Sequence, residues 1–197
     1  MIRCFFTLLF VSIGFAQTSK DTALKFIENK EFIKAQNEMS NYLEANPNDK
    51  YAIELLGDAF GHQKKWDEAI EQYEKLVAAE PKNANYHYKY GGALGMKALS
   101  VSKIRALGII GDVKSAFLKA AELDPKHIDA RWALVELYVS LPGIVGGSNS
   151  KALQYAEELE QLSKVDGYLA KGYVYEYDDE PQLAEKYYRL AIKVGGS

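Results

Sequence analysis

The chain has 197 residues, of which 48% are apolar and 26% charged, with 24 basic and 27 acidic side chains. This composition excludes a wholly disordered chain, because there is enough apolar surface to drive folding. A sequence pI near 5.7 argues against a broad nucleic-acid-binding surface, which needs clustered Lys and Arg to displace counterions. Beyond the N-terminus, no run of about 18 apolar residues is present that could cross a bilayer.

Residues 1–16, MIRCFFTLLFVSIGFA, have the pattern of a cleaved export signal: Arg3, an apolar run of 12 residues, and small residues before Gln17. A helix of that run is about 18 Å long, too short to be retained as a span across about 30 Å of hydrocarbon. We therefore expect cleavage before Gln17, leaving one domain over residues 17–197 that is periplasmic or secreted in a bacterium. Cys4, the single cysteine, lies in the signal, so the exported chain would have no disulfide and no thiolate metal site.

The remaining chain repeats with a period near 34 residues, which is the distance between Pro47 and Pro81. Within that unit, the small residues Gly57 and Ala69 would let two antiparallel helices cross closely, and Tyr73 would fill the space beside the crossing. A proline after the second helix ends the unit. A second good copy closes the chain, with the matching residues Tyr168, Gly172, Tyr175, Ala184, Tyr188 and Ala191. Three partial copies complete about five units.

This pattern resembles the tetratricopeptide repeat, over residues 19 to 197, and the chain is similar to exported bacterial members of that family. The resemblance implies an all-α fold: a right-handed α-solenoid of about five helix pairs, with a concave face built mostly from the first helix, helix A, of each pair. In this family, five positions of helix A tend to face the groove. On this chain they include Tyr51, Glu54, Asp58, Tyr88, Trp132, Glu136, Tyr173, Glu176 and Tyr177.

Such a groove would be aromatic and acidic. Tyr51, Tyr88, Trp132 and Tyr173 could form a ladder of rings along four successive A helices. Aromatic side chains dominate binding energy at interfaces, and the carboxylates favour an extended protein or peptide segment that carries Lys or Arg. The alternative for each ring is packing on the neighbouring helix pair.

Two of the hairpins are expected to be lengthened by loops of related sequence, LGIIGD at 107–112 and PGIVGGS at 142–148. Gly108 and Gly143 are 35 residues apart, close to one repeat, so the loops should lie side by side. Asp112 in the first, and Ser148 or Ser150 in the second, are the expected N-caps of the helices that follow. An apolar ridge, expected to tuck over the solenoid's own edge rather than meet a partner, would comprise Ile109, Ile110, Ile144 and Val145.

Residues suited to catalysis are sparse. His62, His87 and His127 form no HExxH or other close metal pair, and no Ser-His-Asp arrangement is evident. The Gly-rich segment before Lys151 lacks the strand and spacing of a phosphate loop. We therefore expect no enzyme, no metal and no cofactor. Two functions remain: a binding scaffold of the cell envelope that recognises a protein or peptide, and an assembly protein that self-associates through its ends and the apolar loop edge.

Overall fold

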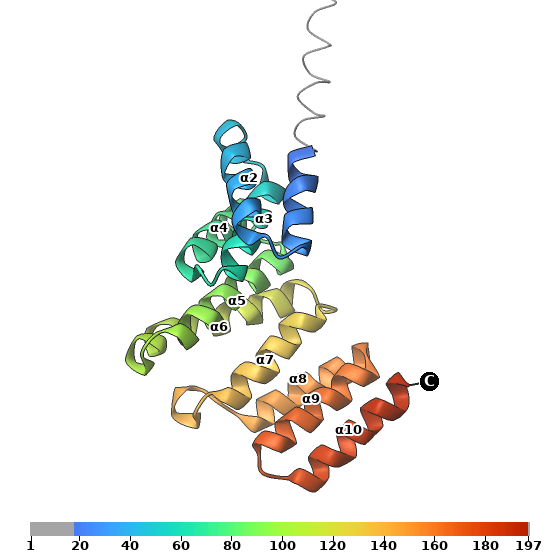
Figure 1. Cartoon of the computed structure of the whole chain (residues 1–197). Helices are drawn as coiled ribbons and strands as arrows, with labels where there is room; N and C mark the ends of the chain where they lie inside the picture. The colour runs from blue at the N-terminus through green and yellow to red at the C-terminus, as the bar shows by residue number, and fades with distance from the viewer. Residues whose placement is uncertain (1–17, 197) are drawn as a thin grey trace, which may run out of the picture. The chain divides into compact units, whose positions relative to one another are not determined.

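The computed structural model describes residues 18–196 (Figure 1). Across this range the regular elements are helices, and no strand is present. The predicted all-α solenoid fold is therefore confirmed. The predicted signal over residues 1–16 lies outside the described residues, and cleavage before Gln17 stays a prediction.

The helices follow one another as antiparallel hairpins (Figure 1). A helix over residues 18–28 comes first and packs with the next helix. The elements after it are α2 (Phe32–Ala45), α3 (Lys50–His62), α4 (Trp66–Ala79), α5 (Ala84–Ser100), α6 (Lys103–Leu123), α7 (Ile128–Ser140), the short 3-10 helix η1 (Gly143–Val145), α8 (Asn149–Leu162), α9 (Lys164–Tyr177) and α10 (Pro181–Gly195).

These helices form two compact units, one ending at Pro81 and the other beginning at Lys82. In the first unit, the helix over residues 18–28 shares a buried core with α2 and α3 through Ala23, Met39 and Leu55. In the second unit, α5 packs on α6, α7 on α8, and α9 on α10. The first helices of these three hairpins, α5, α7 and α9, also contact one another in turn, as stacked repeats require.

The close helix crossings depend on glycine. A Cβ at Gly57 would come within 2.8 Å of the Tyr73 ring, and one at Gly172 within 2.5 Å of the Tyr188 ring. Such distances leave no room for a side chain. The predicted crossing at Gly57 is therefore real, but the group nearest to it is Tyr73 on α4 and not Ala69.

The glycine position and the aromatic position of each crossing differ in side-chain size from one hairpin to the next, and the two changes compensate. Three hairpins pair a glycine with an aromatic ring, and the third of these pairs is Gly91 with Phe117. The α7–α8 hairpin instead has Val135 at the glycine position and Ala156 at the aromatic position, and both are fully buried. A larger residue on one helix is offset by a smaller one on its partner, which keeps the packing density of each crossing.

The expected first loop is helical. Residues 107–112 lie inside α6, which is 21 residues long, and α5 is extended to 17 residues. Asp112 is therefore an interior helix residue and not an N-cap, and α6 begins after Ser102. The segment has glycines but no proline, and a glycine costs a helix only about 1 kcal/mol. Val113 and Phe117, further along the same helix, are buried, and their packing stabilises the helix enough for its first turns to remain helical.

The second expected loop is present. Pro142 precedes η1, Gly146 has a φ of 100°, and Ser148 caps α8 by accepting a hydrogen bond from the Lys151 amide at 3.3 Å. Of the two expected caps, Ser148 is thus the N-cap. Ile144 is 96% exposed, so the expectation that it tucks against the solenoid is wrong. The other members of the expected ridge are half-buried: Ile109, Ile110 and Val145.

Candidate protein-binding face

The candidate site with the most support lies on α5, α7 and α9 of the second unit. We call it the A-helix face and define it by Tyr88 on α5, Trp132 and Glu136 on α7, and Tyr173 and Tyr177 on α9. Glu136 and Tyr177 are exposed, and the other three are half-buried. These helices contact one another in turn, so their side chains form one surface.

Tyr88 packs against two aromatic rings and lies close to two carboxylates. Its ring centroid lies 5.0 Å from that of His127 and 6.1 Å from that of Phe117. Burial first, and then the negative charges of Asp129 and Glu136, raise the pKa of the Tyr88 hydroxyl. The two acidic residues of α7 are therefore close enough to act on a side chain of α5.

Tyr173 lies on α9, the other A helix that contacts α7. Its ring lies 4.9 Å from the Tyr177 ring, at 52°, a tilted arrangement that aromatic pairs favour. Burial, a hydrogen bond with Tyr177 and the charge of Glu136 raise the pKa of the Tyr173 hydroxyl. Glu136 thus acts on tyrosines of both flanking A helices, and the three helices present a continuous aromatic and acidic surface.

Trp132 is partly structural. Its indole Nε1 donates a hydrogen bond to the Asp166 carboxylate at 3.0 Å, which fastens α7 to α9. Packing on the neighbouring pair, the alternative weighed for every ring, therefore applies to this one. The rest of the ring is half-buried, and its exposed part belongs to the face.

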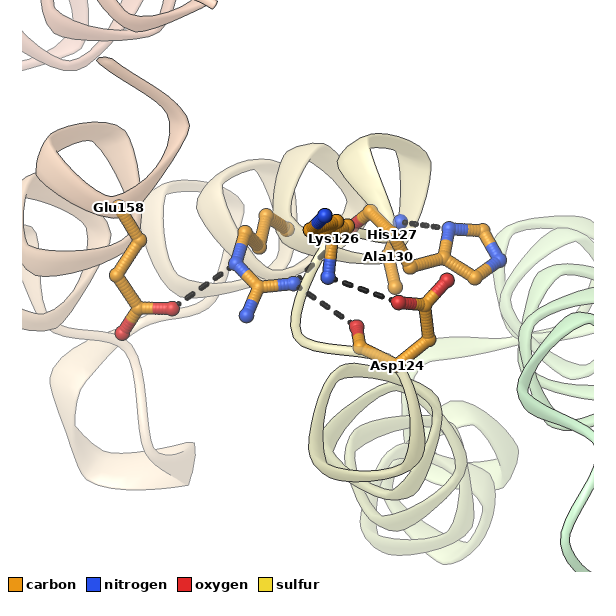
Figure 2. Close-up of polar contacts among 6 residues, drawn as sticks. Asp124, Lys126, His127, Ala130 and Glu158 are labelled. Atoms are coloured by element: carbon orange, nitrogen blue, oxygen red, sulfur yellow. Dashed lines mark hydrogen bonds and ion pairs between the residues drawn. The ribbon is translucent and has the colours of Figure 1, made fainter. Parts of the chain in front are cut away.

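A polar network fixes the start of α7, the helix that carries Trp132 and Glu136 (Figure 2). Buried Arg131 donates from Nε to Glu158 on α8 at 3.0 Å, and from one terminal nitrogen to the carbonyls of Asp124 and His127 at 3.3 and 3.2 Å. The His127 Nδ1 accepts from the Ala130 amide at 3.2 Å and so caps the helix. The same imidazole that caps α7 packs on Tyr88, so this turn positions both.

Two of the predicted acidic residues are engaged within their own hairpins. The Tyr73 hydroxyl donates to Asp58 at 2.7 Å, and the Tyr188 hydroxyl donates to Glu176 at 2.5 Å. Burial and the Glu176 carboxylate raise the pKa of Tyr188 to about 12. Asp58 and Glu176 therefore stabilise helix pairs first and add negative charge to the surface second.

The remaining predicted residues, Tyr51 and Glu54, lie on α3 of the first unit. Tyr51 is exposed. The pKa of Lys20, on the helix over residues 18–28, is raised by its hydrogen bond to Asp49 and, to the smallest degree, by Tyr51. Lys20 itself pairs with Asp49 at 2.9 Å. A single ladder from Tyr51 to Tyr173 stays a prediction, because Tyr51 and Tyr173 belong to different units.

Sequence reasoning missed an open pocket that is lined in part by His127, with a volume of about 560 Å³. It lies between the N-terminal ends of α5 and α7, and its lining mixes charges of both signs. The lining residues are Lys82, Asn83, Ala84, Asn85, Leu123, Asp124, Lys126, His127, Ile128 and Asp129. The available signal was the pair of capping residues, Asn83 and His127, which place two helix starts side by side.

Other classes of site have no support among residues 18–196. Within that range, no cluster of three or more His, Cys, Asp or Glu residues could hold a metal ion. No described helix is both long and apolar enough to cross a membrane.

Comparison with known proteins agrees with the repeat geometry. A family model described as TPR repeat matches residues 57–97, and one described as tetratricopeptide repeat matches residues 165–194. Both matches contain a glycine that faces an aromatic ring across a hairpin, Gly57 in the first and Gly172 in the second. The chain therefore contains tetratricopeptide repeats. Repeats of this kind are typical of scaffolds for protein–protein interaction.

Solved structures with the same fold include two that are described as TPR proteins. A thermophilic TPR protein of Thermus thermophilus is 17% identical, with a TM-score of 0.73 and 90% of each chain covered. MamA is 22% identical, with a TM-score of 0.67 and 90% of each chain covered. YrrB, described as a TPR protein with an unusual peptide-binding site, is 18% identical, with a TM-score of 0.61, 89% of this chain and 84% of that chain covered.

Among curated proteins, the chain is similar to the tetratricopeptide repeat protein 30 homolog of Drosophila melanogaster. The two are 24% identical over 149 residues, which is 76% of this chain. The match spans only 20% of the length of that relative.

Proposed function

We propose that this tetratricopeptide repeat protein is a non-enzymatic scaffold that binds an extended, basic segment of a partner protein on the A-helix face. The observation that carries the proposal is that Glu136 is exposed on α7, which contacts both α5 with Tyr88 and α9 with Tyr173; the charge of Glu136 also contributes to the raised pKa of both tyrosines. A segment laid across the three helices would contact rings on both sides of a carboxylate.

The chemistry of the face favours Lys or Arg in the partner. Asp129 and Glu136 are both exposed, and the guanidinium of Arg or the ammonium of Lys can pair with a carboxylate while its stem lies on a tyrosine ring. Such charge pairs at a solvated surface contribute mainly to the association rate and to specificity, and salt weakens them. The rings contribute the contact area.

Exposed Tyr177 is the better anchor to test on this face. It is 58% exposed, so its truncation removes contact area without opening the core, and the hydrogen bond with Tyr173 that is lost lies within α9 and joins no two helices. Trp132 is less informative, because its removal also breaks the hydrogen bond to Asp166 between α7 and α9.

The proposal includes a location at the cell envelope of a bacterium. The sequence pattern of residues 1–16 supports export, and binding of an extended segment needs no nucleotide or metal. Mass measurement of the protein from its host should give an N-terminus at Gln17. An intact Met1 in the envelope fraction would contradict export with cleavage.

The binding proposal is tested by selecting random peptides displayed on phage against the full chain. We expect the enriched peptides to share Lys or Arg next to apolar residues. A selected peptide, measured by fluorescence anisotropy, should bind Tyr177→Ala about tenfold more weakly than the parent chain. Glu136→Lys should also weaken binding, and this loss of affinity should be larger at low salt than at high salt.

Glu157→Lys is the matched control, because it makes the same charge change at an exposed position of α8, a helix that contributes no residue to the A-helix face. It should leave binding unchanged. Equal losses in Glu136→Lys and Glu157→Lys would show attraction to net charge alone and would reject the face as the site. Selection of acidic peptides would reject the proposed partner chemistry.

A further inference from the structure

The closed end of the α5–α6 hairpin is a second surface with a different chemistry (Figure 1). We call it the hairpin tip and define it by residues 99–107. Leu99 is 81% exposed and Ile104 84% exposed, and Leu107 is exposed as well. In α6 the first buried residue is Val113, so the opening turns of this helix contribute no fully buried side chain.

The hairpin also contains the longest stretch of the sequence without a carboxylate side chain. Between Glu80 and Asp112 there is no acidic residue, although the chain as a whole has 27 against 24 basic ones. The basic residues of this stretch are Lys82, Lys89, Lys97, Lys103 and Arg105. Lys103 and Arg105 are exposed and flank Ile104 directly, so cations surround the most exposed aliphatic side chain of the tip.

We propose that the hairpin tip docks on an anionic lipid surface, with Leu99 and Ile104 inserted among the acyl chains and Lys103 and Arg105 at the headgroups. Aliphatic side chains beside Lys and Arg are the combination that holds peripheral segments in the membrane interface. Anionic lipids attract such cations near the surface, and salt weakens the attraction.

The amino-acid composition of the hairpin tip favours a bilayer over a protein partner. The binding hot spots of protein interfaces are enriched in Trp, Tyr and Arg, and Leu is under-represented among them. Of the three enriched types, the tip has only Arg105. Residues 99–107 contain no aromatic residue, whereas the A-helix face of the same unit is rich in tyrosine. A projecting Leu and Ile also need no shaped pocket in a bilayer, because acyl chains are fluid and accept any apolar group.

The α7–α8 loop carries one further exposed aliphatic side chain. Lys114 of α6 lies beside Gly146, because its Nζ is 3.8 Å from the position a Cβ would take there. Ile144, 96% exposed, is two residues before that glycine. The α7–α8 loop is thus adjacent to the hairpin that carries the tip, and it could add a second point of insertion.

A local probe tests this docking in the full chain. Cys4→Ser removes the single thiol, and Leu99→Cys then takes a polarity-sensitive fluorophore at the tip. We expect blue-shifted emission with vesicles of phosphatidylglycerol in phosphatidylcholine, and no shift with phosphatidylcholine alone. The same fluorophore at Ile192→Cys on α10, where the native side chain is 73% exposed, should stay unshifted. This control separates tip insertion from binding through residues 1–16.

Charge removal tests the second half of the proposal. Lys103→Gln with Arg105→Gln should weaken partition of the labelled tip into anionic vesicles by about tenfold. The matched pair Lys186→Gln with Lys193→Gln, exposed on α10, changes net charge equally and should leave the partition unchanged. Each variant alters exposed side chains only, and circular dichroism checks that it is folded.

Three results would overturn the proposal. The first is an equal shift with neutral vesicles, and the second is an equal shift at residue 192. The third is a shift that grows with protein concentration in the absence of vesicles, because it would show a second copy of the chain on the tip. None of these results bears on peptide binding, so this proposal and the proposed function fail separately.

Discussion

The α5–α6 and α7–α8 hairpins carry insertions of related sequence that fold differently. Both contain a Gly-Ile-(Ile/Val)-Gly motif, beginning at Gly108 in the first and at Gly143 in the second. In the first hairpin the motif lies inside α6 and lengthens a straight antiparallel pair. In the second it forms η1 and a left-handed glycine between α7 and α8.

The difference comes from what surrounds the motif. Pro142 precedes the second copy, and proline disfavours helical geometry in the residue before it. Leu141 has a ψ of 136°, so α7 ends there. Nothing in the first copy forbids helix, and Val113 and Phe117 one turn later are buried against α5. Two similar glycine motifs therefore give a rigid extension in one hairpin and a tight loop in the other.

The largest effect expected from this comparison is that of Gly147→Ala in the second hairpin. A Cβ at this position would lie 1.7 Å from the Leu141 carbonyl oxygen, which is backbone and cannot rotate away. We expect the α7–α8 loop to open, with a loss of about 3 kcal/mol in the free energy of unfolding. Urea denaturation followed by circular dichroism measures the loss.

Gly111→Ala is the matched change in the first hairpin. No atom lies within 4 Å of the Cβ position there, so this variant should be no less stable than the parent chain. If both alanines cost the same, the close approach at Leu141 does not hold the second loop.

Much of the fold could be predicted from the sequence, because the repeat spacing depends on contacts that recur. Gly57 and Gly172 each face an aromatic ring at the same distance along the chain, so the same spacing of residues marks the same helix crossing in both hairpins. The conformation of residues 107–112 could not be predicted in this way. A glycine-rich apolar segment is compatible with helix or loop, and the packing of the turns that follow decides between them.

The site was predictable in composition more than in detail. The positions of Tyr88, Glu136 and Tyr173 on one face follow from the repeat register. The engagement of Asp58 and Glu176 by tyrosine hydroxyls does not, because it depends on the reach of a side chain from the paired helix. The hydrogen bond from Trp132 to Asp166 joins two repeats and likewise needs their packing.

The second test of the comparison concerns the helix starts. Ser148 caps α8 through the Lys151 amide, so Ser148→Ala should lower the free energy of unfolding by about 1 kcal/mol. Asp112→Ala changes the equivalent residue of the first hairpin, where the helix is already formed, and should alter stability by less than about 0.5 kcal/mol. Thermal melts of the two variants make the measurement. A larger loss of stability in Asp112→Ala than in Ser148→Ala would indicate that a helix begins after Asp112.

The smallest expected effect has the opposite sign. Gly108 is exposed within α6 and has no atom within 4 Å of its Cβ position, so Gly108→Ala removes backbone freedom from the unfolded chain without crowding the folded one. The expected gain is about 0.5–1 kcal/mol. Gly143 is the equivalent glycine of the second motif and is equally open, but it lies in a three-residue 3-10 turn with few helical bonds to strengthen. Gly143→Ala should therefore gain less than Gly108→Ala in the same urea titration. An equal gain at both positions would mean that the two motifs have the same helical character in solution, and the contrast between the hairpins would then be wrong.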